Sequence, residues 1–207
     1  MNAKGHGITF GAGCLFLVSA LAVVLSGCAL TVDTVKLDYV PQTGVQKVEL
    51  KEPVRVDVGV VDIRSKKDRV SSKKNGYGME MAAIVAENDV AAVVANAIVA
   101  ELRSRGFQIG QGHVIVNAEL QKFYNDFKVG FFSGDAEAEV VINTKVQGVD
   151  KAVRFAKVVA GEGKEPNIQL SSGENAKLAL DRALADAIAR LFSDPAFVDA
   201  LITAGKL

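Results

Sequence analysis

The sequence predicts an α+β fold, with a mostly antiparallel sheet of about four to five strands and two main helices packed on one face of it. The order of the segments supports this class, because one strand is followed by a helix, then by three strands, and then by a second helix. The strand segments alternate apolar and polar residues, as in antiparallel sheets with one buried and one solvent-exposed face. Each helical segment has a single apolar stripe, which is typical of a helix that covers a sheet.

The N-terminus has the parts of a bacterial secretion leader that ends in a lipidation site. Lys4 provides a short basic region, residues 8–25 are uncharged and largely apolar, and two small residues precede Cys28. This pattern predicts a lipobox, in which the chain is cut before Cys28 and the new N-terminal cysteine receives lipid, including palmitate. The alternative is a retained transmembrane helix, for which about 18–20 apolar residues suffice. Gly11 and Gly13 weaken such a helix, so we favour cleavage and lipidation.

Lipidation at Cys28 makes a membrane the first expected partner. A cysteine with more than one acyl chain is anchored almost permanently, because each buried methylene contributes about 0.8 kcal/mol. Ala29 follows the cysteine, and in enteric bacteria an aspartate at this position retains lipoproteins at the inner membrane. We therefore expect an outer-membrane lipoprotein that faces the periplasm.

Cleavage leaves 180 of the 207 residues, enough for one domain with its own core. We divide the chain into a signal peptide at residues 1–27, a tether and N-terminal hairpin at residues 28–52, and a single α+β domain at residues 53–207. The leader contains one of the 24 basic residues and none of the 24 acidic ones, which leaves 23 against 24 and a net charge of −1. This balance predicts no binding of nucleic acid.

Residues 53–64 have the alternation of a strand that begins at Pro53, with four valines on one face. Residues 65–78 follow without a clear period, and we interpret them as a mobile basic loop. Residues 79–85 are apolar enough for a short strand or helical turn. The basic side chains of this region define a candidate interaction surface that consists of Arg64, Lys66, Lys67, Arg69, Lys73 and Lys74.

That basic surface has two interpretations. Its charges suit the anionic groups of lipid headgroups or peptidoglycan, and each charge contributes about 1 kcal/mol near an anionic surface. The simpler interpretation, which we prefer, is a solvated loop. Asp62 and Arg64 lie two residues apart on one strand face, and we interpret them as a local ion pair rather than as a polar recognition point.

Two good helices are predicted, at residues 88–105 and 173–192. Asn88 or Asp89 caps the first, and a short last helix follows the second after Pro195. Their apolar stripes consist of Val90, Val94, Ala97, Ile98 and Leu102 in the first helix, and of Leu180, Leu184, Ala187, Ile188 and Leu191 in the second.

Alternation predicts three further strands, at residues 113–123, 135–149 and 151–160. The loop between the first two of these strands contains Phe131 and Phe132. These rings and Tyr77 either form a recognition patch with the basic loop or lie at the edge of the core.

The sequence after the leader lacks the residue sets of most catalytic and metal sites. Cys28 is its only cysteine and His113 its only histidine, which excludes disulfides within the chain, Cys/His catalysis and the usual zinc sites. Residues 161–164 lack the Ser or Thr of a phosphate-binding loop and are predicted to lie in a hairpin or loop. Glu137 and Glu139 share a strand face, and solvation explains them better than acid–base chemistry. We expect no cofactor and no enzymatic activity.

The chain resembles the YajG family of bacterial lipoproteins. The resemblance is carried by the lipobox at Cys28, the valine-rich strand that closes on Asp62-Ile63-Arg64, and the helix that ends at Arg103-Ser104-Arg105-Gly106-Phe107. The strand at residues 114–120 and the stretch at residues 175–194 continue it. The resemblance implies an outer-membrane or periplasmic lipoprotein, and it brings no catalytic residues.

The leading hypothesis is a non-enzymatic envelope lipoprotein that binds or scaffolds an envelope protein or peptidoglycan at the outer membrane. The alternative is an accessory subunit of an envelope transport or secretion complex. An enzyme that acts on peptidoglycan or lipid through carboxylates ranks last. The sequence leaves the oligomeric state open.

Overall fold

The structure is a computed structural model, and it describes residues 30–130 and 132–206. The predicted signal peptide, the lipidation site at Cys28 and Phe131 lie outside the described residues. Within the described ranges, none of the helices has the length and apolar character needed to cross a membrane.

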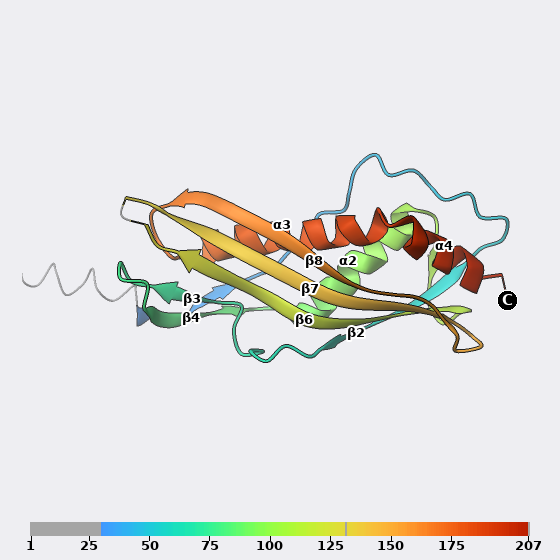
Figure 1. Ribbon diagram of the computed structural model, residues 1–207, viewed down its shortest axis with the longest axis horizontal. Helices are drawn as coiled ribbons and strands as arrows, with labels where there is room; N and C mark the ends of the chain where they lie inside the picture. Colours follow the sequence, from blue (N-terminus) through green and yellow to red (C-terminus); the bar gives the residue numbers. More distant parts are fainter. Residues whose placement is uncertain (1–29, 131, 207) are drawn as a thin grey trace, which may run out of the picture.

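The predicted α+β class is confirmed. A five-stranded sheet in the order β5-β2-β6-β7-β8 forms the body of the molecule, and a three-stranded sheet in the order β1-β4-β3 lies at one end of it (Figure 1). The strands of the large sheet are β2 (Arg55–Asp62), β5 (Gln108–Ile109), β6 (Val114–Lys128), β7 (Gly134–Gly148) and β8 (Val153–Ile168). Those of the small sheet are β1 (Asp33–Val35), β3 (Ser71–Lys74) and β4 (Glu80–Ala86).

Three described helices lie along one face of the long strands, namely α2 (Val90–Ser104), α3 (Gly173–Phe192) and α4 (Pro195–Ala204) (Figure 1). Asp89 caps α2 by accepting from the amide of Ala92 at 2.8 Å, and Ser172 caps α3. All ten apolar-stripe residues predicted for α2 and α3 are buried. The bounds of α3 agree with the predicted second helix because both its periodicity and its caps are local signals.

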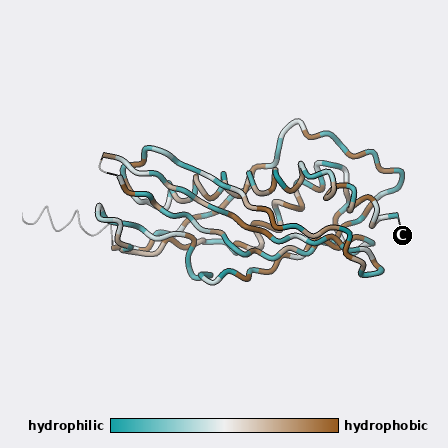
Figure 2. The backbone as a smooth tube through the Cα atoms, viewed as in Figure 1, coloured by the Kyte–Doolittle hydropathy of each residue, from teal (hydrophilic) through white to brown (hydrophobic). Residues whose placement is uncertain are grey.

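The large sheet is mixed rather than purely antiparallel. The strands β6, β7 and β8 form a long antiparallel meander, whereas β2 pairs in parallel with both β5 and β6. Parallel neighbours need a crossover, and α2 provides it between β2 and β6. Alternating hydrophilic and hydrophobic positions are visible along the long strands (Figure 2).

A β-bulge explains why β6 runs past the predicted end at residue 123. Val116 and Leu120 point into the core, and the register then shifts between Leu120 and Lys122. One extra residue reverses the side-chain parity, so Phe123 and Phe127 are the buried residues of the second half. The alternation of apolar and polar residues that predicts the strand is therefore interrupted at the bulge.

The predicted loop at residues 161–164 is instead part of β8, where Gly161 and Gly163 face α3. A Cβ at Gly161 would overlap the backbone of Ala183 and Ala187, and one at Gly163 would overlap the carbonyl oxygen of Ala179. The two glycines therefore let the alanine-rich side of α3 approach the sheet closely.

The segment predicted as a tether and hairpin differs in the structure. Strand β1 pairs in parallel with β4, with Asp33 opposite Ile84, and Leu37 is only 1% exposed. No strand occurs in the described chain between Val35 and Arg55, so the hairpin is not formed. The folded domain thus begins at β1, because its few residues complete the small sheet.

The predicted mobile basic loop is largely the β3–β4 hairpin. Ser71, Ser72 and Lys73 of β3 are buried although they are polar. The amide of Asn125 donates to the carbonyl of Val70 at 2.8 Å, and the Ser71 hydroxyl donates to the carbonyl of Asn125 at 2.9 Å. Hydrogen bonds to β6, rather than an apolar pattern, hold this strand in place.

Candidate functional site

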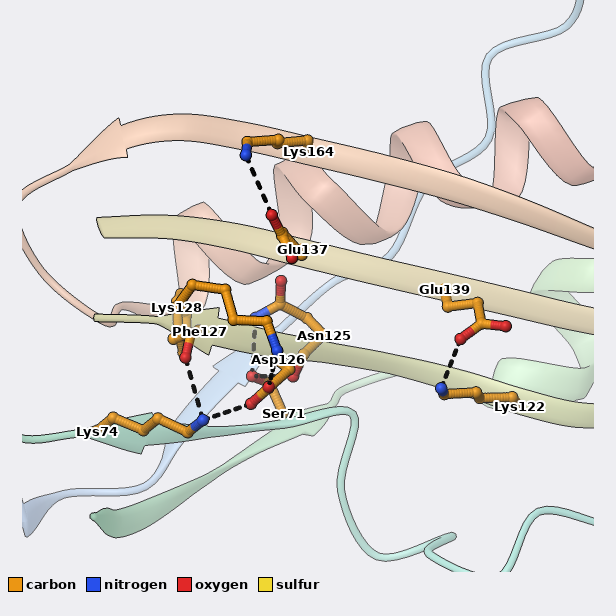
Figure 3. A network of polar contacts seen from close by, with 10 residues as sticks. All are labelled: Ser71, Lys74, Lys122, Asn125, Asp126, Phe127, Lys128, Glu137, Glu139 and Lys164. Atoms are coloured by element: carbon orange, nitrogen blue, oxygen red, sulfur yellow. Dashed lines mark hydrogen bonds and ion pairs between the residues drawn. The ribbon is translucent and has the colours of Figure 1, made fainter. Parts of the chain in front are cut away.

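The sheet face opposite the helices is accessible to solvent, and we call it the open face. In the described structure the half of this face nearest the small sheet is formed by polar residues that alternate outward from three long strands (Figure 3). They line a shallow hollow of about 500 Å³, and the charged ones among them are Lys122, Asp126, Lys128, Glu137, Glu139, Glu162 and Lys164.

Most of these charges are paired across strands. Lys122 Nζ lies 2.5 Å from Glu139 Oε2, and Lys164 Nζ lies 3.0 Å from Glu137 Oε1 (Figure 3). Asp135 and then Glu137 raise the pKa of the Lys164 ammonium above its ordinary value through their hydrogen bonds. Solvent-exposed pairs of this kind contribute little to stability, about 0–1 kcal/mol each. Their main effect is a face that is rich in charge but close to neutral.

Asp126 joins the open face to the small sheet. Its carboxylate accepts hydrogen bonds from Lys74 Nζ at 2.5 Å and from Lys128 Nζ at 2.7 Å, and Lys74 also donates to the carbonyl of Phe127 at 3.0 Å (Figure 3). Burial alone would raise the pKa of Asp126, but the bonds from Lys128 and Lys74 hold that pKa below its ordinary value. The carboxylate therefore stays charged and holds β3 against β6.

The other part of the open face is less charged. A hollow of about 630 Å³ lies there, lined by the backbone at Gly59 and by amide and apolar side chains that include Asn117, Asn143 and Val61. Val61 is 61% exposed on β2, and Val158 on β8 is 53% exposed. Apolar side chains beside amides and paired charges form the kind of mixed surface found in protein–protein interfaces.

The six residues of the predicted interaction surface do not act as one group. Arg64 is 6% exposed and lies between two strands. Its Nη2 lies 2.8 Å from Asp62 Oδ2, its Nε donates to Asp62 Oδ1 at 3.0 Å, and its Nη1 donates to the carbonyl of Phe123 at 3.3 Å. Asp62 and Arg64 therefore form the local ion pair predicted from the sequence, rather than a polar recognition point.

Lys73 and Lys74 also connect elements of the fold. Lys73 Nζ lies 2.7 Å from Asp33 Oδ1 and so ties β3 to β1, while Lys74 binds Asp126. The same Asp33 accepts from the amide of Gly173 at 2.8 Å, at the start of α3. Burial works against ionisation of Asp33, yet Lys73 and the Gly173 amide hold its pKa below the ordinary value.

The other three basic residues lie at the surface. Lys66 and Lys67 are exposed, and Arg69 pairs with Asp68 at 2.9 Å. Lys66 Nζ lies 5.5 Å from the centre of the Tyr124 ring, which places it at the border of the open face. The position of Tyr124 on the open face could not be predicted from the sequence, because it depends on the bulge in β6.

The comparisons with known proteins identify the family. A profile of the family described as "Uncharacterized lipoprotein" matches residues 41–201. The chain belongs to this lipoprotein family. No curated protein matches the lipoprotein.

Two solved structures are similar to the lipoprotein. Protein XCC0632 from Xanthomonas campestris, of family DUF330, is 12% identical with a TM-score of 0.54, over 85% of this chain and 98% of that one. At that identity the likeness concerns the fold alone. The hypothetical protein CT253 from Chlamydia trachomatis is 9% identical with a TM-score of 0.43, over 74% of this chain and 99% of that one.

The family match spans the open face of the lipoprotein, since it begins before β2 and ends within α4. Among residues 30–130 and 132–206, no group of three or more His, Cys, Asp or Glu side chains is placed to hold a metal ion. His113 is exposed at the start of β6. The open face is thus the main candidate site.

Proposed function

We propose that the chain is a lipid-anchored, YajG-like lipoprotein of the outer membrane that faces the periplasm and binds an envelope partner without catalysing a reaction. The observation that carries the proposal is the open face of the large sheet in a chain of a lipoprotein family. Cys28 receives the lipid, and the open face contacts the partner.

The chemistry of the open face favours a protein over peptidoglycan as that partner. Its lysines are matched by carboxylates, so it has no excess of positive charge for an anionic polymer. Exposed valines beside amide side chains suit a polypeptide surface. Attachment of the lipoprotein and its partner to the same membrane raises the local concentration of both.

The arrangement of the carboxylates supports a non-enzymatic role. Glu137 and Glu139 each lie beside a lysine on a wet sheet face, and their side chains are 41% and 40% exposed. Glycosidases instead place two carboxyl groups in a cleft with different environments, one kept protonated and one ionised. Purified protein should release no product from isolated sacculi, and Glu137→Gln should change nothing in that assay.

Photo-crosslinking in living cells tests the binding role. A crosslinking amino acid at Val158 of the open face should capture a specific envelope protein, whereas one at Ala185, exposed on α3, should not. Recovery of a stable stoichiometric complex would place the chain in a transport or secretion machine as an accessory subunit. Identical products from both positions, or none from Val158, would contradict a partner on the open face.

Membrane sorting has its own test. Ala29→Asp should move the protein from the outer to the inner membrane in a density gradient, because the residue after the lipidated cysteine sets sorting in enteric bacteria. Ala29→Ser serves as the matched control and should stay in the outer membrane. An unchanged distribution of Ala29→Asp would contradict the proposed sorting in a host that follows this rule.

A further inference from the structure

The β3–β4 turn, the β6–β7 loop and the β8–α3 connection lie at the end of the molecule where β1 begins (Figure 1), and each contains an exposed apolar side chain. Tyr77 in the β3–β4 turn is 91% exposed, Phe132 in the β6–β7 loop is 87% exposed, and Leu170 between β8 and α3 is 74% exposed. We call this set the apolar rim, and it consists of Leu30, Val32, Tyr77, Met79, Phe132 and Leu170.

The segments of the apolar rim are neighbours in space. The β3–β4 turn, the β6–β7 loop and the β8–α3 connection line one hollow of about 340 Å³, with Gly76, Phe132 and Leu170 among its residues. Strand β1 runs parallel to β4 with Asp33 opposite Ile84, so the residues before Asp33 extend toward the β3–β4 turn. Four segments that are distant in sequence therefore meet at one end.

Hydrogen bonds and a glycine hold the β3–β4 turn in an ordered conformation. Asn75 Oδ1 accepts hydrogen bonds from the amides of Tyr77 and Met79, both at 3.0 Å. Gly78 adopts a φ of 79°, a conformation that few other residues adopt without strain. Tyr77 thus lies on an ordered turn with its ring exposed, and it belongs to a group of exposed apolar side chains, which is typical of an interaction surface.

The proposed lipid lies close to this end. Cys28 precedes Asp33 by five residues, which span at most about 18 Å when fully extended. Asp33 is held firmly, by strand pairing, by Lys73 at 2.7 Å and by the Gly173 amide at 2.8 Å. A lipid on Cys28 therefore keeps this end of the domain near the bilayer surface.

We propose that the apolar rim inserts into the bilayer that holds the Cys28 lipid, so that the domain docks on the membrane instead of moving freely on a tether. The inference rests on the proposed lipid anchor. Single aromatic and aliphatic side chains at turn tips suit the membrane interface, where tyrosine is common. Lys74 and Lys128 line the same hollow as the rim, and both pair with the carboxylate of Asp126.

Tryptophan fluorescence in vesicles tests this docking directly, because the chain contains no tryptophan. Mature lipidated protein, which begins at Cys28, with Tyr77→Trp, Phe132→Trp or Val149→Trp is reconstituted into phosphatidylethanolamine–phosphatidylglycerol vesicles that contain brominated acyl chains. Val149, 53% exposed in the β7–β8 turn, is the matched control. The two rim tryptophans should be strongly quenched and blue-shifted, whereas the control should keep its intensity.

Vesicle flotation separates failure of the docking from failure of the anchor. If the protein floats with the vesicles and neither rim tryptophan is quenched, the docking is refuted while the anchor stands. If the protein does not float, the anchor and the docking are both refuted. Equal quenching at Val149 would also contradict docking through the rim.

Discussion

At the scale of single residues, the basic side chains after β2 divide into structural and surface groups. Arg64 is buried and donates to Asp62 and to the Phe123 carbonyl, whereas Lys66 and Lys67 are exposed. Arg64→Ala should lower the free energy of unfolding by about 2 kcal/mol, because it leaves Asp62 and a buried carbonyl without their partner. Lys66→Ala and Lys67→Ala should change it by less than about 0.5 kcal/mol. Urea denaturation measures all three, and equal losses would contradict this division.

Glu101 is the buried acid that holds the N-terminal segment on α2. Its carboxylate accepts from the Tyr39 hydroxyl at 2.7 Å, from the Gln42 amide at 2.8 Å and from Arg105. Burial by itself would raise the pKa of Glu101, but these three donors hold that pKa below its ordinary value of 4.5. The ionised form is therefore bound more tightly in the folded state than in the unfolded chain.

This difference makes stability depend on pH. Because the folded pKa of Glu101 is the lower one, its contribution is complete above about pH 4.5 and is lost as the pH falls through the folded value. Unfolding free energies measured in urea from pH 7 to pH 3 should decline below that point. Glu101→Gln should unfold about 3 kcal/mol more easily at pH 7 and show a shallower decline, whereas exposed Glu87→Gln should behave like wild type. A decline of unchanged slope in Glu101→Gln would assign the pH dependence to other groups.

At the scale of elements, the contact between β8 and α3 depends on two glycines. Gly161→Ala places a Cβ against the backbone of Ala183 and Ala187. We expect a loss of about 1–3 kcal/mol as the helix is pushed from the sheet. Gly76→Ala is the matched control, since a Cβ there meets nothing within 4 Å. Thermal unfolding compares the two variants, and equal midpoints would show that the close approach is not required.

The elements also show what could be predicted from the sequence. The helices α2 and α3 were predicted well because their stripes and caps are local, and β7 because its alternation is unbroken. The course of β3 could not be predicted, since its buried Ser71 is held by hydrogen bonds with Asn125, which is distant in the sequence. The second half of β6 was missed because the bulge reverses its parity.

The candidate site could be predicted only in part for the same reason. Glu137 and Glu139 were correctly placed on a wet face, because β7 has no shift at these positions. Tyr124 and Asp126 follow the bulge, so their position on the open face depends on pairing with β7. The ion pairs of Lys73 and Lys74 depend on Asp33 and Asp126, and no local pattern connects those residues.

At the scale of the whole molecule, the described structure places two surfaces in different positions. The apolar rim occupies the end where β1 begins, while the open face runs along the length of the large sheet (Figure 1). In the proposed arrangement the rim contacts the bilayer and the open face remains accessible to a partner in the periplasm. Both proposals depend on the lipid at Cys28.

Metabolic labelling of Cys28 is the most direct test of that anchor. Cells that express the full chain are grown with a palmitate analogue, and the protein is isolated and separated into membrane and soluble fractions. The wild-type protein should be labelled and found with the outer membrane, whereas Cys28→Ala should be unlabelled and absent from the outer-membrane fraction. An unlabelled wild-type protein, together with Cys28→Ala in the same fraction, would contradict the account.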